Sequence, residues 1–211
     1  MPEPEHIAGI DEAGRGALAG PVVAGACLIT CELFQRRGSV PWWSPDRKGR
    51  DIRIADSKQL TPEERSLSFA WICSHMPFGV GIVSQEIIDA KGILFANQLA
   101  MRRALHMLRC KTDITRVLVD GKDPFTFDLP HASIIRGDQT EASIAAASIV
   151  AKVTRDRLMC RAERIFPGYG FDEHKGYGTE PHRRSLSALG VSALHRKTFV
   201  KTFLSEQLSF I

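Results

Sequence analysis

Short apolar runs alternate with longer helical stretches along this chain. Apolar runs rich in β-branched residues predict buried strands, which lie at residues 6–10, 21–29, 78–84, 114–119 and 132–135. Helical spacing of apolar positions, or a clear start signal, predicts helices at residues 61–75, 94–108 and 140–166, with one or two more after residue 179. Several strands followed by alternation with helices indicate an α/β protein with a mixed sheet flanked by helices.

Two of the segments between these runs carry local signals of their own. Thr61 and Glu64 fit a capping box at the start of the first helix. Residues 32–55 are basic, aperiodic and interrupted by Pro and Gly, which predicts a long loop. Its Trp42 and Trp43 are suited to stacking on bases, but we expect them to pack the loop onto the body of the protein.

Composition and charge limit the class of protein. A chain of 211 residues with 44% apolar residues can form a hydrophobic core without a disulfide or zinc. Residues 151–211 hold 11 Lys or Arg against 6 Asp or Glu, so the positive charge is concentrated there. A basic C-terminal third is suited to contact with a polyanion, although solvated helices explain the charge equally well.

The chain lacks the signals of a membrane or secreted protein. Its longest apolar run, residues 143–151, is far shorter than a membrane span, and the acidic N-terminus has no apolar signal region. The five cysteines are scattered without a Cys-x-x-Cys pair, which argues against a disulfide framework or a zinc ribbon. We expect a soluble cytoplasmic protein in which most cysteines are buried.

Three of the predicted strands end in acidic residues. Asp11 and Glu12 follow the first strand, Asp120 follows the fourth, and Asp138 follows the fifth. Because the ends of buried strands in such sheets hold ligands, these carboxylates are candidates for one shared site. Clustered carboxylates repel one another unless a cation neutralises them, and oxygen ligands suit Mg²⁺ or Mn²⁺. The pattern therefore predicts a divalent-cation site, a standard device for attack on a phosphodiester.

Each of these acidic residues also has a purely structural interpretation. Asp11 and Asp120 suit turns, and Glu12 suits an exposed position. Asp138 suits a helix N-cap, because the Glu three positions later completes a capping box. Neighbouring strand residues face opposite sides, so Asp11 and Glu12 share a site only where the strand stops. The coincidence of three acidic strand ends favours the metal site.

A Gly-Arg-Gly sequence directly follows the first acidic pair. Gly14 and Gly16 allow backbone amides to approach a sugar or phosphate, and Arg15 adds a charged fork. The same residues formally match a dinucleotide-binding fingerprint. That alternative fails because Pro21 stops the required helix and a new strand follows.

Two further residues are candidates for substrate contact. Lys58, just before the first helix, is suited to holding a phosphate, although a surface lysine is the ordinary interpretation. Tyr177 lies between two glycines in the loop predicted at residues 167–179, where its ring is suited to stacking on a base or sugar. We interpret Asp156 as an ion-pair residue on a helix face and leave it outside the site.

Taken together, these motifs resemble ribonuclease HII of the bacterial type. The resemblance covers roughly residues 7–199, and the ordered set is far more specific than any single motif. The residues that carry it are Ile10–Gly16, Asp56–Lys58, Val119–Gly121, Gly137–Asp138, Ala145–Asp156 and His174–Tyr177.

The resemblance implies a fold, a reaction and a set of partners. The expected fold is RNase H-like, a five-stranded mixed sheet flanked by helices, with a catalytic part at residues 1–166 and a helical substrate-binding extension at residues 167–211. The two parts are expected to form one continuous domain. The implied activity is endonucleolytic cleavage of RNA in RNA/DNA hybrids and at single ribonucleotides in duplex DNA, leaving 3′-hydroxyl and 5′-phosphate ends. We also expect a role in DNA replication and repair and no contact with a membrane. The sequence gives no oligomeric state, and a monomer is the default expectation.

The resemblance also assigns residues by position. Asp11, Glu12, Asp120 and Asp138 correspond to the carboxylates that bind two Mg²⁺ or Mn²⁺ ions. Gly14, Arg15 and Gly16 correspond to the loop that senses the 2′-hydroxyl, and Tyr177 corresponds to the tyrosine that stacks on the following deoxyribose.

This sequence departs from the family pattern at three places, none of which is one of the carboxylates. The loop predicted at residues 32–55 is longer than the connection usual in the family, so the resemblance assigns it no role. Lys122 stands where a polar amide is common, and Gly92 stands where Asn is expected.

Two alternative functions remain at this point. A related metal-dependent nuclease of the same fold would share the acidic residues but not the pairing of Gly-Arg-Gly with Tyr177. A non-catalytic nucleic-acid-binding module would need only the basic C-terminal third and would bind equally well in EDTA.

Overall fold

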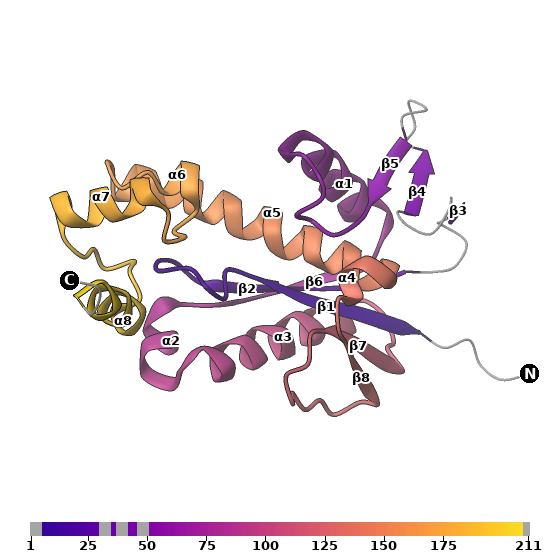
Figure 1. Ribbon diagram of the computed structural model, residues 1–211. Helices are drawn as coiled ribbons and strands as arrows, with labels where there is room; N and C mark the ends of the chain where they lie inside the picture. Colours follow the sequence, from indigo (N-terminus) through magenta and orange to yellow (C-terminus); the bar gives the residue numbers. More distant parts are fainter. Residues whose placement is uncertain (1–5, 30–34, 37–41, 46–50, 209–211) are drawn as a thin grey trace, which may run out of the picture.

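A mixed five-stranded sheet lies at the centre of the computed structural model, which describes residues 6–29, 35–36, 42–45 and 51–208 (Figure 1). The strand order is β6-β2-β1-β7-β8. β2 runs antiparallel to both β1 and β6, whereas β1, β7 and β8 run parallel. The strands span Ile7–Ala13 (β1), Val22–Leu28 (β2), Phe78–Val83 (β6), Arg116–Asp120 (β7) and His131–Ile134 (β8).

Helices cover both faces of the sheet. The long helix α5 (Ala142–Ile165) lies on one face and α3 (Ile93–Arg109) on the other, as Figure 1 shows. Each buries an apolar stripe against the strands, which gives one core cluster on each side. The remaining helices are α1 (Pro62–His75), α2 (Gln85–Lys91), α4 (Gly137–Thr140), α6 (Phe171–His174), α7 (Glu180–Leu189) and α8 (Lys197–Leu208).

Small residues allow α5 to lie very close to the sheet. A Cβ atom at Gly25 of β2 would lie 2.3 Å from the carbonyl oxygen of Ala147, and one at Gly9 would lie 2.2 Å from the backbone nitrogen of Ile144. Neither contact is possible without moving the helix. The Ala-rich start of α5 therefore packs backbone against backbone on β1 and β2, and this fixes the elements that carry the acidic residues.

The predicted mixed sheet and flanking helices are confirmed. The capping box at the start of α1 is also confirmed, because the Thr61 hydroxyl accepts the Glu64 amide and the Glu64 carboxylate accepts the Thr61 amide. The helix α2 was not predicted, since seven residues are too few to show a period.

The prediction of a long loop at residues 32–55 is wrong. The described part of this segment forms a small antiparallel sheet of β3 (Gln35–Arg36), β4 (Trp42–Pro45) and β5 (Asp51–Ile54). Strands of two to four residues show no alternation, and pairing with one another stabilises them. Trp42 and Trp43 lie in β4, but their side chains are outside the described part of the structure.

Two expectations about the cysteines and membrane contact can be compared with the structure. Cys27 is buried, whereas Cys73, Cys110 and Cys160 are exposed, so the expectation of mostly buried cysteines is wrong for these four described residues. All four are free thiols. Over the described ranges, we find no helix with the length and apolar character that crossing a bilayer requires.

Candidate active site

The register of the sheet places Asp11 and Asp120 side by side. β1 and β7 are parallel neighbours, with Ile10 paired to Val119, so the next residues along the two strands are these two acids. β1 is apolar from Ile7 to Ile10 and β7 from Val117 to Val119, so both acidic residues stand where an apolar stretch ends. The site thus follows directly from strand pairing.

Asp138 reaches the same place from a tight turn after β8. Arg136 adopts a left-handed backbone conformation with φ of 57°, and the short helix α4 begins at Gly137. The amide of Gly137 donates to Oδ1 of Asp120 at 2.8 Å, which ties α4 to the end of β7. One carboxylate oxygen from each of Asp11, Asp120 and Asp138 lies within 4.8 Å of the other two. Asp138 lies inside α4 rather than at an N-cap, so the capping alternative is wrong for this residue.

Glu12 is not part of this close cluster. β1 continues through Asp11 and Glu12 to Ala13, so the expected break in the strand comes later and the two acids face opposite sides. Glu12 instead lies near Arg15, with 3.8 Å between its Oε1 and the Arg15 Nη1. Both residues still line the same cavity, so Glu12 lies at the side of the cluster.

The acidic residues are held in an environment that opposes their ionisation. Burial raises the pKa of Asp11 well above its ordinary value, and the charges of Glu12 and Asp120 raise it further. Burial and the charges of Asp56 and Asp120 raise the pKa of Asp138 to about 6. Burial also raises the pKa of Glu12. Such a cluster is stabilised by a bound cation, and three carboxylates are the oxygen donors that Mg²⁺ and Mn²⁺ prefer.

The predicted substrate residues gather around one cavity with a volume of about 410 Å³. Its lining includes Asp11, Glu12, the Gly-Arg-Gly loop, Lys58 and Tyr177. The Lys58 side chain is 81% exposed, and its Nζ lies 4.0 Å from Oδ2 of Asp138. Burial lowers the pKa of Lys58, but the charges of Asp56 and Asp11 outweigh that effect and raise it overall. Lys58 therefore remains a cation at the mouth of the acidic cluster.

Two buried arginines hold the Gly-Arg-Gly loop from below. Arg196 donates to the carbonyls of Gly14 (2.6 Å), Arg15 (2.8 Å) and Gly20 (3.0 Å). The side chain of Arg155 packs against Gly14, whose φ of 90° suits glycine and where a Cβ would lie 1.9 Å from the Arg155 Nε. Because the loop's carbonyls are bonded inward, its exposed edge at Gly16 is left facing the cavity.

Several residues of this site were not predicted from the sequence. The Asp123 carboxylate accepts hydrogen bonds from both terminal nitrogens of Arg15 and so holds that side chain in place. Lys152 lines the cavity and pairs with Asp156 at 2.8 Å, so the interpretation of Asp156 as an ion-pair residue agrees with the structure. Asn97 of α3 is fully buried, and its side-chain amide, close to Glu12, opposes the rise in the pKa of that carboxyl.

A sequence signal existed for only one of them. Lys152 lies within the motif Ala145–Asp156, whereas the residues at positions 97 and 123 meet the site only through tertiary packing.

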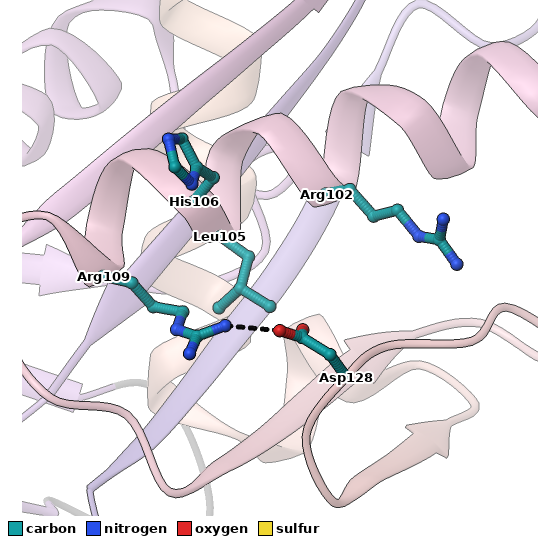
Figure 2. Close-up of a pocket in the computed structure, with 5 residues that line it drawn as sticks. All are labelled: Arg102, Leu105, His106, Arg109 and Asp128. Carbon is teal, nitrogen blue, oxygen red and sulfur yellow. Dashed lines mark hydrogen bonds and ion pairs between the residues drawn. The ribbon is translucent and has the colours of Figure 1, made fainter.

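A second hollow, with a volume of about 320 Å³, lies along α3, on the opposite face of the sheet from α5 (Figure 2). It contains a single carboxylate, Asp128, which is paired with Arg109 at 2.6 Å. The hydrogen bond from Arg109 lowers the pKa of Asp128. With one neutralised acid beside Arg102 and His106, this hollow lacks the donors of a divalent-cation site.

Comparison with known proteins agrees with this geometry. A family model described as Ribonuclease HII matches residues 8–203. A protein named Ribonuclease HII from Chloroflexus aurantiacus is 47% identical over 195 residues, which cover 92% of this chain and 86% of the relative.

Solved structures share the fold at lower identity. The structure of the PCNA:RNase HII complex from Archaeoglobus fulgidus aligns with a TM-score of 0.67 and 22% identity, over 91% of this chain and 94% of that one. Bst-RNase HIII in complex with Mn²⁺ aligns with a TM-score of 0.64 and 18% identity, over 95% of this chain and 70% of that one. At these identities the structural matches establish the RNase H-like fold.

Proposed function

The chain belongs to the ribonuclease HII family, and we propose that it cleaves the RNA strand of RNA/DNA hybrids and incises duplex DNA on the 5′ side of single ribonucleotides. Family membership makes the protein a ribonuclease H, a hydrolase of the endonuclease type. The products of the proposed reaction carry 3′-hydroxyl and 5′-phosphate ends. The observation that carries the proposal is the cluster of three carboxylate oxygens within 4.8 Å beside a cavity lined by the Gly-Arg-Gly loop and Tyr177.

We propose that Asp11, Asp120 and Asp138 bind divalent cations, with Glu12 completing the ligand set from the adjacent position on β1. The donor set fits Mg²⁺ or Mn²⁺, since it consists of oxygen atoms whose mutual repulsion a cation would relieve. Ions bound by these residues would supply the chemistry of the reaction, which is activation of a water for in-line attack on phosphorus and stabilisation of the departing 3′-oxygen. The residues themselves fix the place of the cations, and through them of the scissile phosphate, at the end of β1 and β7, where the strand register sets the spacing of Asp11 and Asp120.

The cavity lining supports recognition of a ribonucleotide within a duplex. The exposed backbone at Gly16 can approach a 2′-hydroxyl closely, because Arg196 binds the carbonyls of Gly14 and Arg15 from the opposite side. Tyr177 lines the same cavity and offers a ring for the neighbouring sugar. Lys58 and Lys152 place two cations beside the acidic cluster, which suits a phosphate backbone.

One cleavage assay tests the proposal. The substrates are a duplex with a single ribonucleotide, a continuous RNA/DNA hybrid and an all-DNA control, each with Mn²⁺, with Mg²⁺ or with EDTA. We expect metal-dependent cleavage of the first two and no cleavage of the third. Asp120→Asn should abolish cleavage while hybrid binding is largely kept, and cleavage of the all-DNA duplex or full activity in EDTA would overturn the proposal.

A further inference from the structure

Three histidines pack together directly beneath the Tyr177 loop and are not used by the proposed chemistry. His182 of α7 and His195 in the segment before α8 are 0% and 1% exposed. The His174 ring stacks on His182 with ring centroids 4.3 Å apart. The rings of Tyr169 and Phe171 close the cluster from the side.

The hydrogen bonds of this cluster fix where each proton lies. Nδ1 of His182 lies 2.9 Å from the carbonyl oxygen of Tyr177, which only accepts, so this nitrogen carries the proton. Nδ1 of His195 accepts the backbone amide of Ser192 at 3.0 Å, so the proton of His195 is on Nε2. The two Nε2 atoms are 3.0 Å apart, and His195 therefore donates to His182.

The result is a directed chain from Ser192 through His195 and His182 to Tyr177. Both rings must be neutral. A second proton on His182 would place its Nε2–H against that of His195, and a second proton on His195 would place its Nδ1–H against the Ser192 amide. His174, stacked on His182, is the other titratable group that influences the pair, and it too lowers the pKa of both rings. Burial is the larger cause and lowers the pKa of His195 to about 4, so the chain persists at neutral pH.

The chain ends on the residue that we assign to sugar recognition. The Tyr177 carbonyl is held by His182, and its amide donates to the carbonyl of His174 at 3.0 Å. Both peptide groups of Tyr177 are thus fixed from below, while its ring faces the cavity and lies 5.2 Å from the Arg155 guanidinium.

The same segment also holds the Gly-Arg-Gly loop. Arg196 follows His195 directly, and its side chain binds the carbonyls of Gly14, Arg15 and Gly20. Its amide donates to Leu18 at 2.8 Å. One short stretch before α8 therefore contacts both loops that line the cavity.

We propose that His182 and His195 are positioning residues that orient Tyr177 for recognition of the sugar beside a single ribonucleotide. The inference rests on the proposed function of Tyr177. It assigns part of the C-terminal extension to holding the recognition loops, in addition to any contact with the duplex.

A matched pair of variants at His195 tests the inference. In His195→Gln the amide nitrogen replaces Nε2 and can still donate to His182, whereas His195→Leu fills the space and cannot donate. For His195→Leu we expect kcat/KM on the single-ribonucleotide duplex to fall by about tenfold. The Tyr177 ring is still present in this variant but is no longer held in place, so part of its stacking on the sugar is lost. The continuous hybrid should lose less than about twofold, and His195→Gln should restore most of the loss. Nitrogen-15 NMR of the imidazoles should show protons on Nδ1 of His182 and Nε2 of His195.

Each outcome separates the inference from the proposed function. Tyr177→Ala is run in parallel. If that variant cleaves the single-ribonucleotide duplex as well as the wild-type protein does, the role of Tyr177 itself is overturned. If Tyr177→Ala is selective but His195→Leu lowers both substrates equally, or His195→Gln behaves like His195→Leu, the histidines only support the fold and the inference fails. The opposite tautomers in the NMR spectrum would also overturn it.

Discussion

Removing one charge from the acidic cluster should abolish cleavage and stabilise the metal-free protein. Asp11→Asn keeps an oxygen that can accept the Glu12 amide, which now donates to Asp11 Oδ1 at 2.7 Å. Two unit charges 4.8 Å apart repel by about 3.5 kcal/mol at an effective dielectric constant of 20. Because partial protonation already relieves some of this repulsion, we expect the variant to gain about 1–3 kcal/mol in the free energy of unfolding.

The gain should depend on pH in a defined direction. Burial, and then the charges of Glu12 and Asp120, raise the pKa of Asp11 in the folded protein, so ionisation of this carboxyl destabilises the wild-type protein as the pH rises. As the pH falls, the folded cluster takes up protons, with the pKa of Asp138 raised to about 6, and wild-type stability recovers. The advantage of Asp11→Asn should therefore be largest near pH 8 and shrink toward pH 5.

Urea denaturation in EDTA and in excess Mg²⁺ measures both effects. Metal at about 100 times its Kd should stabilise the wild-type protein by about 2.7 kcal/mol, and the variant by clearly less. Asp113→Asn, at an exposed position before the start of β7 and so beyond the opposite end of that strand from Asp120, serves as the matched control and should change neither value. An Asp11→Asn protein that is less stable than wild type in EDTA at pH 8, or a wild-type protein indifferent to metal, would refute the reasoning.

Four further predictions concern the cavity and the core. Tyr177→Ala should lower kcat/KM on a single-ribonucleotide duplex by about 10-fold or more, with a smaller loss on a continuous hybrid; equal losses would contradict a role in sugar recognition. Gly25→Ala should cost about 3 kcal/mol of stability by thermal denaturation, since its Cβ would lie 2.3 Å from a carbonyl oxygen of α5. Gly16→Ala, where nothing lies within 4 Å, should keep its stability but lose activity. Lys58→Ala should weaken hybrid binding and reduce the slope of log Kobs against log salt by about 0.9, and an unchanged slope would remove Lys58 from phosphate contact.

The inner strands of the sheet could be predicted because they are largely buried and most of their residues are apolar. The same property made the acidic ends of β1 and β7 conspicuous, and parallel pairing of these strands is enough to bring Asp11 and Asp120 together. Asp138 could be predicted in the same way, because it follows β8, the parallel neighbour of β7. The Gly137 amide, which donates to Asp120, then holds the turn that carries Asp138 beside the end of β7.

The sequence pattern did not reveal features that depend on exact register or on tertiary packing. β1 continues two residues beyond Asp11, so Glu12 lies at the side of the close cluster and not within it. Asn97 and Asp123 meet the site only because α3 and the loop after β7 pack beside it. The strands within residues 35–54 are too short for any periodicity, and they are stabilised only by one another.

Anomalous diffraction from crystals grown with Mn²⁺ and a single-ribonucleotide duplex tests the central claim most directly. The account predicts manganese peaks within coordination distance of Asp11, Asp120 and Asp138, next to the phosphate on the 5′ side of the ribonucleotide. Manganese bound elsewhere, or a duplex seated away from these three carboxylates, would contradict it.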